Sequence, residues 1–317
     1  MILVTGANGF IGNSLCHFLS RLNIPAIGAV RFENSFLKFQ NVKHVSVGDI
    51  SFDTNWSKIL KNCEYIVHCA GKVHDMNNAN NLDNYRKVNI EGTKNLAEQA
   101  ANAGVKRLIF LSSVKVNGES TDNISNDPNK KVFRHYDIPN PQDGYSMSKF
   151  EAEKVLWEVS SKSGLEIVVV RLPLVYGRSV KGNLAKLIKI VQSGIPLPLS
   201  LVKNQRSMIG IDNLIDLLIR CMDHPNAAGK IFLASDIENL STPDLIKSLA
   251  NSMGRKSRLF PVPIFLLRLL GSILGKQKEI NRLLGSLKID SSYTQEVLNW
   301  IPPVSVTEGI RRMVQSK

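Results

Sequence analysis

The chain has 317 residues, of which 43% are hydrophobic, and no apolar run reaches the ~20 residues that a membrane-spanning helix needs. Its four cysteines lie in apolar surroundings without a C-x-x-C pair, which favours buried thiols over a metal site or a disulfide framework. The net charge of +13 is not accompanied by interleaved aromatic residues or a recognition module. We therefore expect a cytoplasmic globular protein that binds neither a metal nor nucleic acid.

Apolar segments alternate with helical patterns along the first half of the chain. Six segments are typical of strands buried on both faces of a sheet: ILVT (2–5), AIGAVR (26–31), HVSVGD (44–49), YIVHCA (65–70), RLIFLSS (107–113) and EIVVVRL (166–172). Helical patterns lie between them, for example over 82–103 and 146–163. This alternation predicts an α/β fold with a doubly wound parallel sheet of the Rossmann type.

The pattern becomes less regular after about Leu174, where prolines and glycines mark repeated breaks. We therefore divide the chain into a sheet domain, residues 1–174, and a smaller C-terminal lobe formed mainly by residues 175–317. Some strands or helices of the second part can return to the sheet.

Three glycines follow the first predicted strand at three-residue spacing, in TGANGFIG. Gly6 permits a sharp turn from strand to helix, and the missing side chain of Gly9 lets a diphosphate approach the backbone. Gly12 lets the helix pack closely against the sheet. The free N–H groups at the helix start would then face a pyrophosphate. The spacing differs from the commoner G-x-G-x-x-G, so a turn without a ligand stays an alternative for this motif alone.

Tyr145 and Lys149 are four residues apart in YSMSK, on one face of a helix that starts near Tyr145. A free phenol has a pKa near 10, and a close ammonium together with a cofactor cation can lower it by about three units. Such a phenol can exchange a proton with an alcohol at neutral pH. Ser113 ends the strand predicted over 107–113, at the carboxyl edge of the sheet, where ligands bind in folds of this kind. These three residues are the predicted catalytic set.

Seven motifs in this order resemble the extended short-chain dehydrogenase/reductase family, also called the NAD-dependent epimerase/dehydratase family: TGANGFIG, GDI, HCAG, VNIEGT, LSSVKVNG, YSMSK and VVVRLPLVYG. They span residues 2–177, and weaker similarity continues to about residue 302. The segments SSVKVNGE and RLPLVYGRSVKGN are similar to UDP-hexose 4-epimerase-like proteins, a group that includes 4-ketoreductases forming UDP-N-acetylquinovosamine. The resemblance implies an NAD(P)-dependent enzyme that acts on a UDP-sugar.

The resemblance also implies roles for single residues. Ser113 would hydrogen-bond the reacting oxygen, Tyr145 would be the acid/base, and Lys149 would lower the pKa of Tyr145 and hold the nicotinamide ribose. The resemblance implies that the backbone of Phe10 and Ile11 contacts the pyrophosphate, and that Asp49 and Ile50 form the adenine pocket. It also implies that Ala70 and Gly71 pass under the cofactor, and that Asn89 supports the central strands. With Gly6, Gly9, Gly12, Tyr145 and Lys149, they make up the implied cofactor site.

The implied substrate residues, which would hold the UDP diphosphate and ribose, are Asn183 in KGN, Arg206 in NQRS, and Arg282. The chain departs from the family pattern at Asn117, where a tyrosine is frequent, and at Leu174, where an asparagine is common. Its substrate contacts therefore need not be those of the family. Val114 and Lys115 stand where sugar 4,6-dehydratases carry an Asp–Glu pair, which argues against dehydration.

Arg31 ends the second predicted strand, where NAD-binding members usually carry an acid that accepts hydrogen bonds from the ribose 2′-hydroxyl. A guanidinium would instead pair with the 2′-phosphate of NADP. We therefore expect NADP(H) to be favoured, with NADPH bound at least about tenfold more tightly than NADH, or about 1.4 kcal/mol. NAD(H) is the alternative, in which Arg31 stacks on the adenine.

Three functions stay open. The first is reduction of C4 of a UDP-4-keto-6-deoxy-N-acetylhexosamine for a surface polysaccharide precursor, which a preference for NADPH favours. The second is a UDP-glucose or UDP-N-acetylglucosamine 4-epimerase with tightly bound NAD. The third is a non-catalytic dinucleotide-binding sensor or scaffold, against which the intact set of Ser113, Tyr145 and Lys149 argues.

A basic stretch lies between Arg255 and Lys288, where eight lysines and arginines surround the apolar segment PIFLLRLLGSIL and one acid, Glu279. The segment is too short to span a membrane but can lie in its interface. The alternative is a lobe helix with a solvated basic flank. The partners we expect are a UDP-sugar, this peripheral contact with the inner face of the membrane, and a second copy in a homodimer.

Two histidines lie near the predicted site. His68 stands in the strand predicted over 65–70, whose apolar neighbours favour a structural role in the core. His74 follows that strand, where a solvated loop position is expected for it.

Overall fold

A computed structural model describes residues 1–33, 39–73, 82–122, 124 and 131–315. His74 lies outside these ranges. Within them, seven strands form one parallel sheet in the order β3-β2-β1-β4-β5-β6-β9. Their bounds are β1 Ile2–Thr5, β2 Ala26–Val30, β3 Val42–Ser46, β4 Tyr65–His68, β5 Arg107–Ser113, β6 Glu166–Leu172 and β9 Lys230–Leu233.

All six predicted strands are present in the sheet, with one shift in position. The strand predicted over 44–49 runs instead from Val42 to Ser46. Gly48 adopts a φ of 67°, a left-handed conformation that does not continue a strand. The chain therefore leaves the sheet before Asp49, which places Asp49 in the loop beyond the strand.

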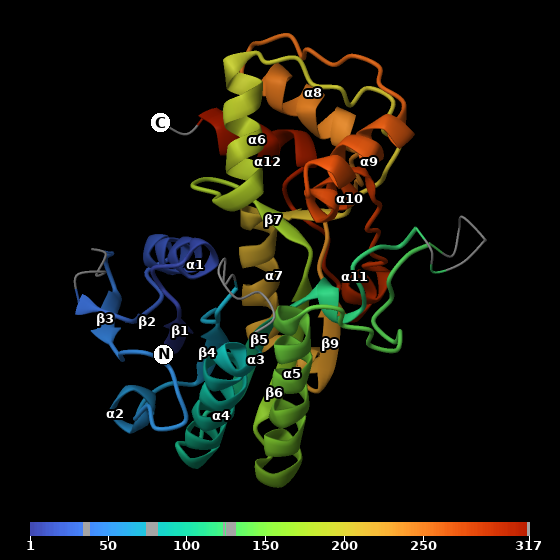
Figure 1. Cartoon of the computed structure of the whole chain (residues 1–317). Coiled ribbons are helices and arrows are strands. Elements are labelled where there is room, and N and C mark those ends of the chain that lie inside the picture. Colours follow the sequence, from blue (N-terminus) through green and yellow to red (C-terminus); the bar gives the residue numbers. More distant parts are fainter. Residues whose placement is uncertain (34–38, 74–81, 123, 125–130, 316–317) are drawn as a thin grey trace.

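Helices cover both faces of the sheet (Figure 1). One face carries α1 (Phe10–Arg21), α7 (Ile211–Asp223) and α11 (Ser292–Leu298), which share one apolar core. The other carries α2 (Ser57–Leu60), α4 (Gly92–Asn102) and α5 (Gly144–Ser163), which share a second core. The helix predicted over 82–103 consists of α3 (Leu82–Tyr85), a π-helical turn η2 (Arg86–Glu91) and α4. This two-faced arrangement is the predicted Rossmann-type fold.

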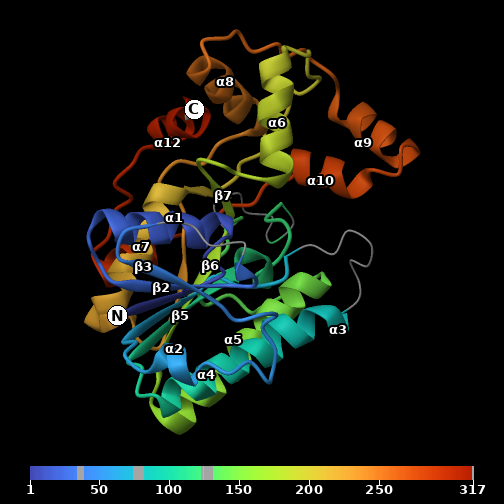
Figure 2. The same ribbon diagram turned by 90° about the vertical axis from the view of Figure 1, so that its left-hand side faces the viewer.

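A smaller lobe stands above the carboxyl ends of the central strands (Figures 1 and 2). It holds a two-stranded parallel sheet of β7 (Leu174–Tyr176) and β8 (Met208–Gly210), and the helices α6 (Gly182–Ser193), α8 (Thr242–Ser252), α9 (Ile264–Ile273), α10 (Gln277–Leu284) and α12 (Val306–Gln315). The lobe has its own apolar core. Its elements come from three separate runs of the chain, because α7, β9 and α11 return to the main sheet. None of the helices in the described ranges is both long and apolar enough to cross a membrane.

Beneath the candidate site, a buried ion pair joins the central sheet to α5. The Arg171 guanidinium of β6 lies 2.6 Å from the Glu153 carboxylate, and both side chains are only 2% exposed. Arg171 also donates to the side-chain oxygen of Asn117 at 3.0 Å. The Ser112 hydroxyl at the end of β5 donates to Glu153. One carboxylate therefore connects α5, β5 and β6.

We expect Glu153→Ala to lower the free energy of unfolding by about 3–5 kcal/mol, because it leaves the Arg171 charge buried without a partner. Urea denaturation followed by circular dichroism measures this change. Glu151→Ala is the matched control on the same helix, since Glu151 pairs with Arg86 at 3.3 Å in a more exposed position. The control should cost about 1 kcal/mol or less. Equal costs for the two variants would contradict the role given to Glu153.

Candidate active site

The turn after β1 has the two properties that its glycines predict. Gly6 adopts a φ of 64°, and a Cβ there would lie 2.9 Å from the backbone nitrogen of Ala70. A Cβ on Gly12 would collide with the carbonyl oxygen of Gly6. The N-cap of α1 is Gly9, and the first turn of the helix carries no acidic residue. The helix start is therefore compatible with an anionic group.

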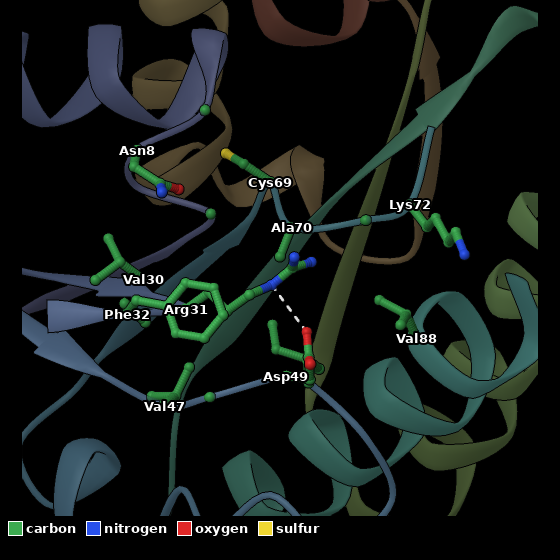
Figure 3. Close-up of a pocket in the computed structure, with 16 residues that line it drawn as sticks. Asn8, Val30, Arg31, Phe32, Val47, Asp49, Cys69, Ala70, Lys72 and Val88 are labelled. Carbon is green, nitrogen blue, oxygen red and sulfur yellow. Dashed lines mark ion pairs between the residues drawn. The ribbon is translucent and has the colours of Figure 1, made fainter. Parts of the chain in front are cut away.

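A pocket of about 380 Å³ opens beside this turn, at the carboxyl ends of β1, β2 and β4 (Figure 3). This is where the strand order of the sheet reverses, which is the usual ligand position in open α/β folds. The pocket brings together seven of the predicted cofactor residues: Gly6, Gly9, Arg31, Asp49, Ile50, Ala70 and Gly71. Phe10, Ile11 and Gly12 follow directly in the first turn of α1.

Arg31 and Asp49 form an ion pair across the mouth of this pocket, with 2.8 Å between Nε and Oδ1 (Figure 3). Their side chains are 58% and 67% exposed, so the pair is solvated and weak. The Arg31 guanidinium also lies 5.8 Å from the centre of the Phe32 ring. The sequence motifs give Arg31 and Asp49 separate roles and do not reveal this contact. A carboxylate thus stands next to the guanidinium from which the NADP preference was predicted.

Ser113 and Tyr145 meet at the end of β5. Ser113 is the last residue of β5, and its side chain accepts a hydrogen bond from the backbone N–H of Lys115 at 3.2 Å. Tyr145 is the second residue of α5, and its phenol lies close enough to Ser113 for that hydroxyl to act on its pKa. Burial and the negative charge of Asp143 raise the pKa of Tyr145, whereas the Ser113 hydroxyl acts in the opposite direction. The phenol is therefore held in its protonated form.

Lys149 lies buried below this pair. Its Nζ donates to the carbonyl oxygen of Leu111 at 2.9 Å and lies 4.5 Å from the centre of the Phe110 ring. Burial lowers the pKa of Lys149 to about 8. The hydrogen bond made by the ammonium goes to this carbonyl and not to the phenol of Tyr145. A lowered pKa of Tyr145 therefore stays a prediction that depends on the charge of a cofactor.

Asn89 fixes the loop that borders Lys149. Its side chain accepts from the backbone N–H of Lys72 at 2.8 Å, donates to the carbonyl of Lys72 at 3.1 Å and donates to the hydroxyl of Ser148 at 2.9 Å. Asn89 lies in the π-helical turn η2 and is buried. It thus connects the loop after β4 to α5, one residue before Lys149, rather than supporting the strands directly.

Asp143 anchors the start of α5. Its carboxylate accepts from the backbone N–H of Ser146 at 2.7 Å and from the Lys115 ammonium at 2.7 Å. Burial opposes ionisation, but the hydrogen bonds from Lys115 and Ser146 outweigh it and lower the pKa of Asp143 to about 2. Lys115 also donates to Glu119 at 2.6 Å. Lys115 stands where sugar 4,6-dehydratases carry an acid, and here it helps to hold the helix that carries Tyr145.

His68 is a buried residue of the core. Its two ring nitrogens lie 2.7 Å from the Thr5 hydroxyl and 3.0 Å from the Thr93 hydroxyl. Burial, followed by the positive charge of Lys149, lowers the pKa of His68 to about 3. The imidazole is neutral at physiological pH, in agreement with the structural role expected for it.

Two of the three predicted substrate residues lie together in the lobe. Arg206 donates to the carbonyl oxygens of Arg282 at 2.7 Å and of Gly285 at 3.1 Å. Burial and the charge of Arg282 lower the pKa of Arg206. Asn183 takes no part in this contact and is exposed in the first turn of α6, at the end of the helix that faces the sheet (Figure 1).

Three residues that position the candidate catalytic set have no role in the sequence-based prediction: Ser148, Glu153 and Arg171. Two signals were present in the sequence. Arg171 interrupts an otherwise apolar predicted strand, and a buried charge requires a partner. Glu153 follows Lys149 by four residues and so lies on the same face of α5.

Comparison with known proteins finds relatives along almost the whole chain. The NAD dependent epimerase/dehydratase family matches residues 2–234. The chain is 41% identical over 322 residues to a UDP-glucose 4-epimerase of Vibrio cholerae, covering 99% of this chain and 94% of the relative. It is 23% identical to the N-acetyl-alpha-D-glucosaminyl-diphospho-ditrans,octacis-undecaprenol 4-epimerase of Escherichia coli O157:H7, again over 99% and 94%.

Solved structures show the same fold. A UDP-glucuronic acid 4-epimerase from Bacillus cereus in complex with NAD has a TM-score of 0.77 at 21% identity, covering 98% of this chain and 96% of the other. A UDP-glucose 4-epimerase from Thermotoga maritima with UDP-glucose has a TM-score of 0.76 at 21% identity, covering 99% and 97%. The family match covers more than half of the chain, and the Vibrio relative aligns along almost its whole length. This chain belongs to the NAD dependent epimerase/dehydratase family.

Proposed function

We propose that this protein is a 4-epimerase of a UDP-hexose or UDP-N-acetylhexosamine that keeps NAD bound. The observation that carries the proposal is the 41% identity to a UDP-glucose 4-epimerase along 99% of the chain. The proximity of Ser113 and Tyr145 supports it, as does the position of Lys149 next to Gly71, which lines the pocket. Reduction of a 4-keto sugar would use the same residues, but its support was the NADP preference expected from Arg31, and a carboxylate, Asp49, stands beside that guanidinium.

The pocket suits a dinucleotide in shape and charge. The glycine turn and the acid-free start of α1 would hold the pyrophosphate through the backbone of Phe10 and Ile11. Asp49 and Ile50 would border the adenine. NAD held there would supply a reversible hydride acceptor for C4 of the sugar, and epimerisation would require the keto sugar to rotate before the hydride returns.

The remaining cofactor contacts lie closer to the reacting carbon. Ala70 and Gly71 would pass under the cofactor, while Tyr145 and Lys149 would hold the nicotinamide ribose. We assign the sugar nucleotide to the lobe, mainly residues 175–317, and its diphosphate and ribose to Asn183, Arg206 and Arg282. The cationic side chains of this set complement a diphosphate.

Tyr145 would take the proton from the C4 hydroxyl and give it back to the C4 ketone oxygen. Ser113 would hydrogen-bond the same oxygen. Burial raises the pKa of Tyr145, which keeps the phenol protonated and makes it a weaker acid, so both half-reactions need a lower pKa than burial alone gives. Accepting a proton in the first half-reaction requires positive charge nearby, which Lys149 and the oxidised cofactor would supply.

Product analysis distinguishes the epimerase from the reductase. Purified protein should convert UDP-glucose to UDP-galactose, or UDP-N-acetylglucosamine to UDP-N-acetylgalactosamine, without added cofactor. In D₂O the product should keep its hydrogen at C4, because a hydride that stays on the cofactor does not exchange with solvent. Product analysis by NMR measures both. Oxidation of NADPH with a UDP-4-keto-6-deoxy-N-acetylhexosamine, without any epimerisation, would support the reductase instead.

Replacement of the phenol tests the acid/base role. Tyr145→Phe should reduce kcat by about 10²–10⁴-fold, because the proton of the C4 hydroxyl loses its acceptor. The amount of copurified NAD should stay nearly unchanged. Tyr136→Phe is the matched control, since Tyr136 is 68% exposed and lies outside the site. A Tyr145→Phe enzyme with the wild-type rate would refute the assignment.

Cofactor choice depends on the pair at the pocket mouth. Wild-type protein should bind NAD⁺ more tightly than NADP⁺, because Asp49 both occupies Arg31 and repels a 2′-phosphate. Asp49→Asn should shift the ratio of the two Kd values toward NADP⁺ by at least about tenfold, or ~1.4 kcal/mol. Calorimetric titration of nucleotide-free protein measures the ratio. Asp53→Asn, at an exposed nearby carboxylate, should leave it unchanged. A wild-type preference for NADP⁺ would restore our sequence-based expectation.

A further inference from the structure

Exposed apolar side chains are concentrated on α9. Twenty large hydrophobic side chains are exposed in the described ranges, and six of them belong to α9 or its C-cap: Phe265, Leu266, Leu269, Leu270, Ile273 and Leu274. Their exposed fractions run from 38% to 71%. Single exposed hydrophobic residues need no explanation, but a cluster on one element marks an interaction surface.

The opposite side of α9 is anchored. Leu267 is 5% exposed, and Gly271 lies so close to α10 that a Cβ there would be 2.7 Å from the Ile280 side chain. At 3.6 residues per turn, the exposed positions from 265 to 273 fall within one arc of about 140°. The helix is therefore fixed to the lobe through one stripe and presents a continuous apolar face to solvent. Figure 2 shows α9 at the outer edge of the lobe, away from the sheet.

Cations border this face. The exposed ones in the stretch are Arg255, Lys256, Arg258, Arg268, Lys276 and Arg282. Among the described residues none of the six forms an ion pair with an acid. Arg268 lies within α9 at the margin of the apolar arc, and Lys276 follows two residues after the C-cap. The surface thus combines an apolar centre with a rim of unpaired positive charge.

We propose that α9 and its basic rim bind the surface of an anionic lipid bilayer. The apolar face would enter the boundary between headgroups and acyl chains, and the cations would contact anionic headgroups. With ten residues, α9 is too short to cross the bilayer, so it would lie in the interface plane. A second copy of the chain fits this face less well, because a two-fold interface would bring two basic rims together.

The position of α9 gives this binding a further consequence, which rests on the proposed function. α9 packs on α10, and the carbonyl of Arg282 in α10 accepts the hydrogen bond from Arg206. The apolar face is therefore only one helix away from the proposed diphosphate-binding arginines. Docking through α9 would hold these arginines close to the lipid surface.

Vesicle flotation of the full chain tests the binding. Recovery with vesicles of phosphatidylcholine and about 30% phosphatidylglycerol should be at least about fivefold higher than with phosphatidylcholine alone. Raising the salt from about 0.15 M to 0.5 M should reduce it, because the Debye length shortens. Equal recovery with both kinds of vesicle would overturn the proposal.

Two pairs of variants separate the apolar and the charged contributions. Leu269→Gln with Ile273→Gln should abolish flotation, whereas Ile237→Gln with Ile301→Gln, at exposed hydrophobic residues elsewhere, should preserve it. Flotation that survives the change in α9 would refute the docking face.

The double variant Arg268→Gln with Lys276→Gln should weaken flotation. The matched control, Lys58→Gln with Lys61→Gln at two exposed lysines elsewhere, should leave flotation unchanged. Circular dichroism and the rate with a soluble UDP-sugar, expected to be unchanged, show that the variants are folded. They also distinguish a failure here from a failure of the proposed reaction. A halved molecular mass for the α9 variant in light scattering would assign the face to a dimer and overturn the proposal.

Discussion

A buried ammonium at the end of β5 is the constraint on which the centre of the molecule depends. Removing Lys149 from water disfavours its charge and lowers its pKa to about 8, so the charge requires close partners. The carbonyl of Leu111 and the ring of Phe110 contact it, and the negative charge of Glu153 acts on it from a greater distance. Gly71 completes the enclosure, because a Cβ there would lie 3.2 Å from Nζ. The glycine that would pass under a cofactor thus also leaves room for the lysine beside it.

The partners of that ammonium are themselves tied to other elements. Glu153 neutralises Arg171 in β6 and accepts from Ser112 in β5. Arg171 reaches Asn117, whose amide donates to the carbonyl of Arg134 at 3.0 Å. A polar network therefore extends from α5 through two strands to the loop beside the site. Because its members are satisfied and largely buried, this network favours one arrangement of the strand ends.

Local patterns in the sequence predicted the parts of the fold that depend on local forces. The six buried strands follow from apolar runs, and the turn after β1 follows from the conformational freedom of Gly6. The place of Ser113 at the ligand-binding edge followed from its position at the end of a predicted strand, whereas its joint role with Tyr145 was implied by the family resemblance. In contrast, the Arg31–Asp49 pair forms between loops that follow different strands, and no periodicity encodes such a meeting. The two residues were assigned separate roles for that reason.

The lobe was harder to predict, for two physical reasons. Its core is assembled from separate runs of the chain, so its segments show no continuous alternation, and β9 was not recognised as a strand of the main sheet. α9 is apolar around most of its circumference. Such a segment has the same hydrophobic pattern in the sequence whether one side or all sides of the helix are buried. Only the packing against α10 shows which residues stay exposed.

The chain passes repeatedly between the lobe and the sheet, and this limits how the lobe can move relative to the sheet. β6 and β9 are neighbours in the sheet, with Val168 paired to Lys230, although β7, α6 and β8 of the lobe lie between them in the chain. A second excursion, α8 to α10, runs between β9 and α11, and a third leaves α11 for α12, the last element of the described chain. A lobe joined by one linker can swing as a rigid body about that linker. In this chain the same movement would have to deform several connections at once.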